Sequence, residues 1–288
     1  MPDTRFLAPT ICSILGLRPP SMSQVPPLDQ VKRDLDGCES VLVVVFDGFG
    51  MAAWRRLRGA APQLGKLAER RLVEIHAVPP PKTPVNFASM ATGASIEVHR
   101  VAEKTDPIRA ETIFEVLRDS GLSTCVAARA SGSPAHLFSH LVDYPSVAFS
   151  NTDQEVSELA ESTLSGRRPN LTLVQFLDID GASHKFGPFS QAALEAVSRT
   201  DLRLRKLLDV CRNLRICTIV LADHGQHEVC ENGAQGARSV GRHDGTSPSD
   251  FSVPLTWASW ENLTPPGTTN ANTFEPGSES RVLEGREG

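Results

Sequence analysis

The chain has 288 residues, of which 40% are hydrophobic and 22% charged, and its net charge at pH 7 is −5. This length suits one large α/β domain or two small ones. The mild negative charge and the lack of a long basic run argue against a dedicated nucleic-acid surface, and no stretch approaches the roughly 18 apolar residues of a transmembrane helix. The N-terminus lacks the basic start, the unbroken apolar run and the cleavage site of a signal peptide.

Six cysteines are scattered along the chain, and none form a Cys-x-x-Cys pair. In a chain that can build a full core without covalent links, this pattern is typical of reduced, mostly buried thiols. We therefore expect a cytoplasmic protein.

The N-terminal half alternates buried apolar runs with turns. Residues 40–46 form a continuous β-branched run, which suits a strand buried on both faces in a parallel sheet. Asp-Gly at 47–48 and three prolines at 79–81 mark turns. The elements predicted here, in chain order, are a helix at 8–17, a strand at 40–46, a helix from 51 to about 71, a strand at 72–78 and a helix that begins at 86–92.

The C-terminal half continues this alternation. Residues 111–120 have apolar side chains at helical spacing and end at Gly121, which is a suitable C-cap. The elements predicted here are helices at 111–120, 152–164 and 191–210, and strands at 123–128, 171–177, 216–221 and 253–257. Few apolar residues follow, so we predict one catalytic domain at 1–263 and a disordered tail at 264–288.

The order of these elements predicts the fold class. Strands that alternate with helices favour an α/β fold with a mainly parallel central sheet and helices on both faces. Open sheets of this kind bind ligands at the carboxyl ends of their strands.

Three of the predicted buried strands end in residue types that bind metals. Carboxylate oxygens and neutral imidazole nitrogens are the ligands that zinc and similar divalent ions prefer. Because the carboxyl ends of parallel strands meet at one edge of a sheet, these side chains are expected to converge on a metal site. In chain order they are Asp47 after the strand at 40–46; Asp178, Asp180 and His184 after 171–177; Asp223 and His224 after 216–221; and His243 shortly before the last strand.

Each of these residues also has a structural explanation when it is taken alone. Asp47 and Asp180 each precede a glycine, which is a common turn pair, and Asp223 can cap a helix. The recurrence of Asp and His at three strand ends is what favours metal ligation. Asp178 is expected to support the site without touching the metal, because its spacing to His184 is longer. The remaining histidines, which lack this support, are expected not to be ligands: His76, His99, His136, His140 and His227.

At these residues the sequence resembles the alkaline phosphatase superfamily and, within it, the type I phosphodiesterase / nucleotide pyrophosphatase branch. The likeness runs from about Val41 to Leu255, and its pieces occur in the order that the family shows. They are VLVVVFDGFG at 41–50, KTPVNFASMATG at 82–93, the segment 98–124, DIDGASHKFGP at 178–188, ADHG at 222–225 and His243.

The sequence also departs from the family pattern. The Pro-Asn of the nucleophile motif is Val85-Asn86, with the proline at Pro84, and Ser183 stands in place of a motif glycine. Residues 8–20 resemble a segment that commonly closes the fold in relatives, so we hypothesise a permuted topology in which the usual C-terminal helix lies at the N-terminus. The chain leaves little room for a large cap domain, which often sets specificity in relatives.

The resemblance implies a hydrolase with a Thr nucleophile at a two-metal site. Thr83 would attack phosphorus and form a phospho-threonine intermediate, and Asn86 would donate a hydrogen bond to a phosphoryl oxygen. Taken alone, Thr83 is an ordinary helix N-cap and Asn86 a polar residue at a helix start. Zinc is the expected metal, with manganese, magnesium or iron as alternatives. The implied ligands are Asp47, Asp223 and His224 for the ion that touches Thr83, and Asp180, His184 and His243 for the other.

Charge counting favours a phosphodiester or a nucleotide pyrophosphate as the substrate. Two dications against three aspartates and one alkoxide leave the site near neutral, whereas a dianionic monoester favours a further cation such as Lys82 or Lys185. Phosphomonoester or phosphonate hydrolysis is the alternative, and a non-catalytic relative that binds metal or phosphate is the alternative of another class. The expected partner is a small phosphorylated molecule, with nucleotides among the candidates, and no stable nucleic-acid or membrane partner is expected.

Overall fold

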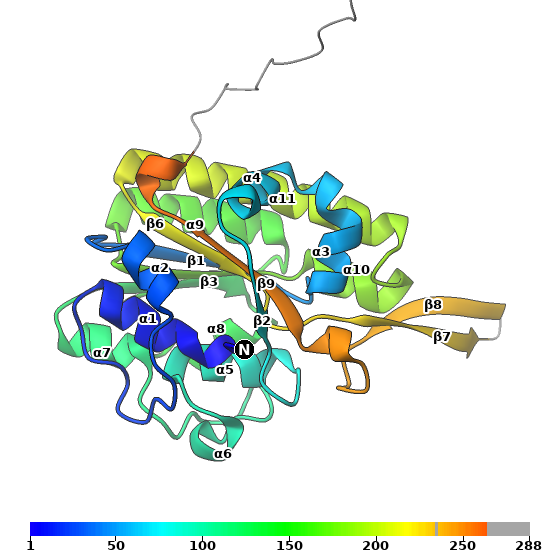
Figure 1. The fold of residues 1–288 in the computed structure, drawn as a ribbon, viewed down its shortest axis with the longest axis horizontal. Coiled ribbons are helices and arrows are strands. Elements are labelled where there is room, and N and C mark those ends of the chain that lie inside the picture. Colours follow the sequence, from blue (N-terminus) through cyan, green and yellow to red (C-terminus); the bar gives the residue numbers. More distant parts are fainter. Residues whose placement is uncertain (234–235, 264–288) are drawn as a thin grey trace, which may run out of the picture.

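The computed structural model describes residues 1–233 and 236–263, with a large sheet at its centre (Figure 1). The strands of this sheet are β1 (Val41–Phe46), β2 (Val73–His76), β3 (Thr124–Arg129), β4 (Tyr144–Ala148), β5 (Leu171–Phe176), β6 (Cys217–Leu221) and β9 (Ser252–Ala258). The seven strands lie in the order β2-β9-β6-β1-β5-β3-β4. β9 is antiparallel to both of its neighbours, and the other neighbouring pairs are parallel. The predicted mainly parallel sheet is confirmed.

Helices cover both faces of the sheet, as predicted (Figure 1). One face carries α3 (Met51–Leu57), α4 (Pro62–Arg70), α9 (Asp153–Arg167), α10 (Asp178–Phe186) and α11 (Gln191–Leu214). The other carries α1 (Leu7–Ile14), α5 (Thr83–Thr92), α7 (Ile113–Asp119) and α8 (Ser133–Phe138), and the short helices α2 (Asp29–Asp34) and α6 (Ile96–His99) lie in connections. None of the helices within the described ranges is both long and apolar enough to cross a membrane.

The register of the central strands brings their carboxyl ends level. All six residues of β1 are buried, as expected for a strand with helices on both sides. Phe46 at the end of β1 pairs with Phe176 at the end of β5, and Val45 pairs with Leu221 at the end of β6. Residues that follow these three strands therefore emerge at one edge of the sheet.

Several elements differ from the predictions, among them the helices α8 and α10, which were not predicted. The single helix from 51 to about 71 is wrong: α3 ends at Leu57, and α4 starts anew at Pro62, whose ring and missing N–H disfavour a helix interior. β4 was not predicted, because its half-buried sequence contains Pro145 and shows no clear alternation. The antiparallel pair β7 (His227–Gly233) and β8 (Gly236–Arg242) was also missed, and it projects from the domain beside α10 (Figure 1).

The N-terminal helix packs on the main sheet. Leu7 and Ile11 of α1 lie around one small apolar gap with Val43 of β1 and Leu171 of β5. The same sheet contains β9, so α1 does not lie away from the sheet of the last strand. The permutation itself stays a prediction, and the tail predicted at 264–288 lies outside the described residues.

The cysteines are not all reduced. Cys38 and Cys217 form a disulfide that joins the segment before β1 to the start of β6, so the prediction of free thiols is wrong for this pair. Their separation of 179 residues gives no local pattern from which the pairing can be predicted. The other four are free; Cys12, Cys125 and Cys211 are buried, and Cys230 is exposed.

Candidate metal centre

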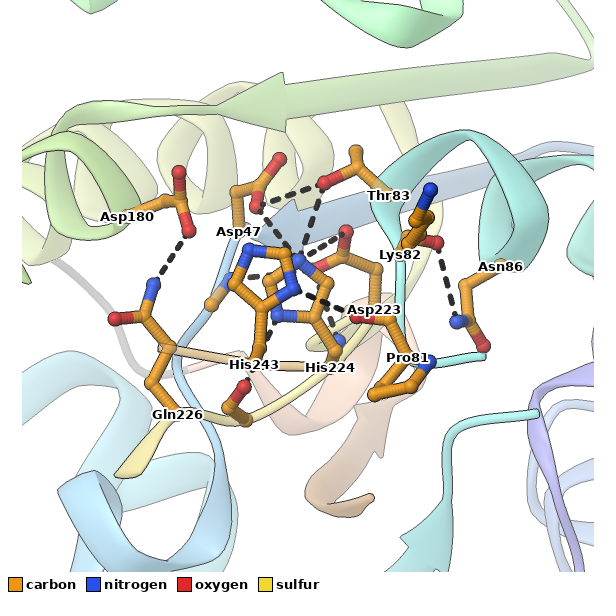
Figure 2. Close-up of polar contacts among 12 residues, drawn as sticks. Asp47, Pro81, Lys82, Thr83, Asn86, Asp180, Asp223, His224, Gln226 and His243 are labelled. Carbon is orange, nitrogen blue, oxygen red and sulfur yellow. Dashed lines mark hydrogen bonds and ion pairs between the residues drawn. The ribbon is translucent and has the colours of Figure 1, made fainter. Parts of the chain in front are cut away.

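Side chains from three neighbouring strands meet at the carboxyl edge of the sheet. Asp47 directly follows β1, the helix α10 begins just after β5, and Asp223 and His224 follow β6. Thr83 is the first residue of α5, and His243 comes directly after β8. Figure 2 shows that these side chains are turned toward a common centre. The fold therefore brings together residues that are up to about two hundred positions apart in the chain.

The first group is arranged around the imidazole of His224. Its Nε2 lies 3.5 Å from Asp47 Oδ1, 3.5 Å from Asp223 Oδ2 and 3.1 Å from Thr83 Oγ1. Thr83 Oγ1 is also 3.5 Å from Asp47 Oδ1. The Nδ1 of His224 lies 3.1 Å from the carbonyl oxygen of Gly225, to which it donates its proton. The Nε2 lone pair therefore faces the two carboxylates and the hydroxyl, as in a metal-ligating histidine.

The electrostatics of this group favour a bound cation. Asp47, Asp223 and His224 are fully buried. Burial raises the pKa of Asp47 well above its usual value, and the nearby charges of Asp223 and Asp180 raise it further. Burial likewise raises the pKa of Asp223. A positive charge placed among these oxygens would offset both effects.

One carboxylate oxygen of this group accepts no hydrogen bond. Asp223 Oδ1 accepts the N–H groups of Gly48 at 3.2 Å and of His224 at 3.0 Å, whereas the buried Oδ2 accepts no hydrogen bond. An unpaired buried acceptor costs about 1–3 kcal/mol, so such atoms are rare without a functional reason. This orphaned oxygen fits a metal ligand.

The second group consists of Asp180, His184 and His243, whose ligand atoms lie within 4.8 Å of one another. The Nε2 atoms of His184 and His243 are 3.0 Å apart, and His184 Nε2 lies 3.4 Å from Asp180 Oδ1. Each Nδ1 donates to a backbone carbonyl: His184 to Gly241 at 3.0 Å and His243 to Pro81 at 2.7 Å. Both Nε2 atoms are thereby aimed at the same place, where a proton or a metal ion can lie between them.

The two histidines of this group have pKa values shifted in opposite directions. The hydrogen bond to Asp180 raises the pKa of His184, whereas burial lowers the pKa of His243 to about 4. Burial alone would raise the pKa of Asp180, but its hydrogen bond with His184 and the charges of the three histidines lower it. The carboxylate of Asp180 thus favours a positive charge beside His184, and a divalent ion can supply that charge.

Asp180 connects the two groups. Its carboxylate also lies within 4.8 Å of the ligand atoms of Asp47 and His224. The six predicted ligands thus form one continuous cluster. The donor set of carboxylates and neutral imidazoles fits zinc and related divalent ions.

Asn86 lies beside this cluster, and both ends of its side-chain amide are engaged. Asn86 is fully buried, and its Oδ1 accepts from Thr4 Oγ1 and from the N–H of Val78, both at 2.8 Å. Its Nδ2 donates to the carbonyls of Val78 and Lys82, each at 3.3 Å. A hydrogen bond to a phosphoryl oxygen would replace one of these two long bonds, and the substrate role of Asn86 stays a prediction.

Asp178 and Lys82, the two residues expected to support the site, have other partners. Asp178 lies at the start of α10, where its carboxylate accepts hydrogen bonds from Arg129 and, at 3.0 Å, from Arg203. These bonds hold the first turn of the helix that carries Asp180 and His184. Lys82 forms an exposed ion pair with Glu103, 2.9 Å from Nζ to Oε1.

Two glutamines at the site were missed by the sequence analysis. Gln175 of β5 donates from Nε2 to Asp47 Oδ2 at 2.5 Å, and Gln226 donates from Nε2 to Asp180 Oδ1 at 2.5 Å. Each amide occupies one oxygen of a predicted ligand. Glutamine has no special frequency at metal sites, and neither residue lies in a motif, so the sequence contains no signal for them.

A third set of side chains is also close enough to hold an ion: His227, Asp244 and Asp250. Buried Asp250 accepts from His227 Nδ1 at 2.7 Å and from the N–H of Gly245 at 3.0 Å. These bonds already satisfy the carboxylate, which explains the cluster as a structural tie between β7 and the loop before β9.

A family model matches most of the chain. The model of the family described as type I phosphodiesterase / nucleotide pyrophosphatase matches residues 41–120 and 130–285. A search of the curated proteins found no significant match.

Several solved structures share the fold. Phosphonoacetate hydrolase from Sinorhizobium meliloti 1021, in complex with phosphonoformate, is 22% identical with a TM-score of 0.53 over 70% of this chain and 59% of its own. Murine ectonucleotide pyrophosphatase / phosphodiesterase 5 is 20% identical with a TM-score of 0.55 over 68% of this chain and 59% of its own. The C-terminal periplasmic domain of EcEptC from Escherichia coli, in complex with Zn, is 13% identical with a TM-score of 0.56 over 78% of this chain and 74% of its own. The match thus covers less than two thirds of the length of the phosphonoacetate hydrolase and of the ectonucleotide pyrophosphatase / phosphodiesterase 5.

Proposed function

Because the chain belongs to the type I phosphodiesterase / nucleotide pyrophosphatase family, we propose that it is a metal-dependent phosphoric ester hydrolase that cleaves phosphodiester or nucleotide pyrophosphate bonds. The observation that carries the proposal is the place of the Thr83 hydroxyl. It lies 3.1 Å from His224 Nε2 and 3.5 Å from Asp47 Oδ1, at the head of α5 and beside the cluster of predicted ligands. A nucleophile at this point lies beside the predicted ligands, at the carboxyl ends of the central strands.

Two divalent ions, zinc by preference, would be held by the two groups of side chains described above. When bound, they would neutralise charge on the phosphoryl group and favour the ionised form of the Thr83 hydroxyl. The proposed ligands are Asp47, Asp223 and His224 in the first group, and Asp180, His184 and His243 in the second.

Thr83 is proposed as the nucleophile. Its Oγ1 attacks phosphorus, the bond from phosphorus to the leaving oxygen breaks, and a phospho-threonine forms. Water then cleaves the new bond to phosphorus and restores the hydroxyl. Thr83 is the first residue of the ten-residue helix α5, so N–H groups of the first turn can donate to a phosphoryl oxygen there.

The charges around the site favour a substrate with one negative charge on its phosphoryl group. Lys82 precedes the nucleophile, but Glu103 already pairs with its ammonium group. The Nζ of Lys185 lies 5.0 Å from the centre of the Phe186 ring, to which it is attracted. Neither lysine is left as a dedicated cation for a dianionic monoester. A diester or pyrophosphate linkage needs less such compensation.

The test compares bis(p-nitrophenyl) phosphate with p-nitrophenyl phosphate for wild type and Thr83→Ala, with and without a chelator. We expect higher activity on the diester, loss of activity with the chelator, and a loss on the order of a thousandfold or more in Thr83→Ala. Thr105→Ala, which changes an exposed threonine, is the matched control and should keep full activity. Unchanged activity in Thr83→Ala would refute the nucleophile.

The same assay separates the alternatives. Higher activity on the monoester, or phosphate release from phosphonoacetate alone, would replace the diester proposal with the corresponding hydrolase. Stoichiometric metal binding without turnover of any of these substrates would indicate a binding protein.

A further inference from the structure

Gln226 joins the two groups of predicted ligands. It lies two residues after His224, in the connection that also carries Asp223, and its Nε2 donates to Asp180 Oδ1 on α10 at 2.5 Å. Figure 2 shows its side chain reaching toward Asp180. Gln226 is therefore a direct link from the backbone of one ligand group to a ligand of the other.

The space for this link is kept by two glycines from different parts of the chain. A Cβ on Gly48 would lie 2.8 Å from Gln226 Nε2 and 2.9 Å from Asp180 Oδ1. A Cβ on Gly241 would lie 2.1 Å from Gln226 Oε1. Any side chain at either position would displace the amide or the carboxylate. Gly241 also supplies the carbonyl that accepts the hydrogen bond from His184 Nδ1. The same residue therefore fixes the position of His184 and leaves the space that the Gln226 side chain occupies.

The contact does not serve folding alone. Gln226 is 3% exposed, and its Oε1 is buried without a hydrogen-bond partner. An apolar side chain of the same length would fill the space without stranding an oxygen. What the amide contributes is the hydrogen bond from its Nε2, which holds Asp180 Oδ1 in place.

We propose that Gln226 is a positioning residue that sets the second metal position by holding Asp180 at a fixed place relative to the Asp223–His224 segment. The proposal rests on the two-metal site of the proposed function. An oxygen fixed by a donor leaves the carboxylate with one orientation, which lowers the cost of ordering it around an ion. Without the donor, Asp180 is free to rotate away from His184 and His243.

The test is a calorimetric titration of chelator-treated protein with Zn²⁺, for wild type and Gln226→Met. Wild type should bind two ions per chain. Gln226→Met should keep one of them at unchanged affinity and bind the other 10- to 100-fold more weakly, the range seen when a group that supports a metal ligand is lost. Saturating Zn²⁺ should restore turnover. The midpoint of thermal unfolding of the metal-free variant should be no lower than that of wild type.

Gln154→Met is the matched control, because Gln154 makes a similar amide–carboxylate bond to Glu158 at 2.7 Å on the exposed side of α9. It should leave both affinities unchanged. Two unchanged affinities in Gln226→Met would overturn the inference and leave the proposed function intact. A lower melting temperature of the metal-free variant, with both ions lost, would show a structural role and overturn it as well. Fewer than two ions on wild type would instead refute the two-metal premise.

Discussion

His99 is expected to make the stability of the fold depend on pH below neutrality. It is fully buried at the end of α6, and its Nδ1 accepts the N–H of Val101 at 3.1 Å. The proton of the neutral ring therefore lies on Nε2, which faces Ser89 Oγ in α5 at 3.1 Å. A second proton would have to go onto Nδ1, where it would break the bond from Val101 and place a charge in the core. Burial accordingly lowers the pKa of His99 from 6.5 to about 4.

The size of the effect follows from this shift. Above about pH 6.5 the ring is neutral in both the folded and the unfolded chain, so its contribution to stability is fully present. Between about pH 6.5 and 4 the unfolded chain binds a proton that the folded chain does not, and the free energy of unfolding falls as the pH falls. Lowering the pKa of His99 from 6.5 to about 4 corresponds to a loss of about 3 kcal/mol in the free energy of unfolding at pH 4.

The assay is urea unfolding of wild type and His99→Asn, followed by circular dichroism at several pH values from 4 to 7.5. Asn cannot titrate, and its Oδ1 can replace Nδ1 as the acceptor for Val101. The stability difference between the two proteins should shrink by about 3 kcal/mol from pH 7.5 to 4. His140→Asn, at an exposed position, is the control and should show little difference at any pH. Parallel profiles for wild type and His99→Asn would refute the reasoning.

Two further substitutions test the supports of the metal centre. Asp153→Ala should lower the free energy of unfolding by about 3 kcal/mol or more. The reason is that buried Asp153 accepts hydrogen bonds from Arg129 Nε at 2.7 Å and from the N–H groups of Leu177 and Asp178 at the start of α10. A loss below about 1 kcal/mol in urea unfolding would contradict this. Gly225→Ala should cost at least about 1–3 kcal/mol and weaken Zn²⁺ binding, because its Cβ would lie 2.0 Å from the carbonyl oxygen of Ser249. In the same unfolding assay Gly166→Ala, with open space around it in α9, should instead stabilise the protein by about 0.5–1 kcal/mol, and similar effects of the two alanines would refute the steric argument.

The parts of the fold that could be predicted are those whose sequence pattern reflects burial. Strands β1, β5 and β6 are buried at every position because helices cover both faces of the sheet. Their sequences are therefore rich in apolar residues, so they can be recognised without knowledge of their neighbours. Strand β4 lies at the edge of the sheet, where half-buried positions and Pro145 produce no such run. The hairpin of β7 and β8 pairs mainly with itself, so its residues carry little signal of a core.

The candidate site divides in the same way. Asp47 and Asp223 could be found because each lies just beyond the end of a recognisable strand, and the rule that parallel strands share a carboxyl edge brings them together. Gln226 could not be found, because its role depends on the space left by Gly48 and Gly241 and on the place of Asp180. Such contacts depend on how the loops pack, and they cannot be predicted from the residue types alone.

The orientation of the histidines shows why the ligand set alone does not define a metal site. His184, His224 and His243 each donate from Nδ1 to a backbone carbonyl, and the three carbonyls belong to Gly241, Gly225 and Pro81. Any residue has a carbonyl, so these acceptors leave no trace in the sequence, yet they decide which nitrogen faces the ion. The residue types therefore determine which ions the site can bind, whereas the loop conformations determine whether the donors point at one another.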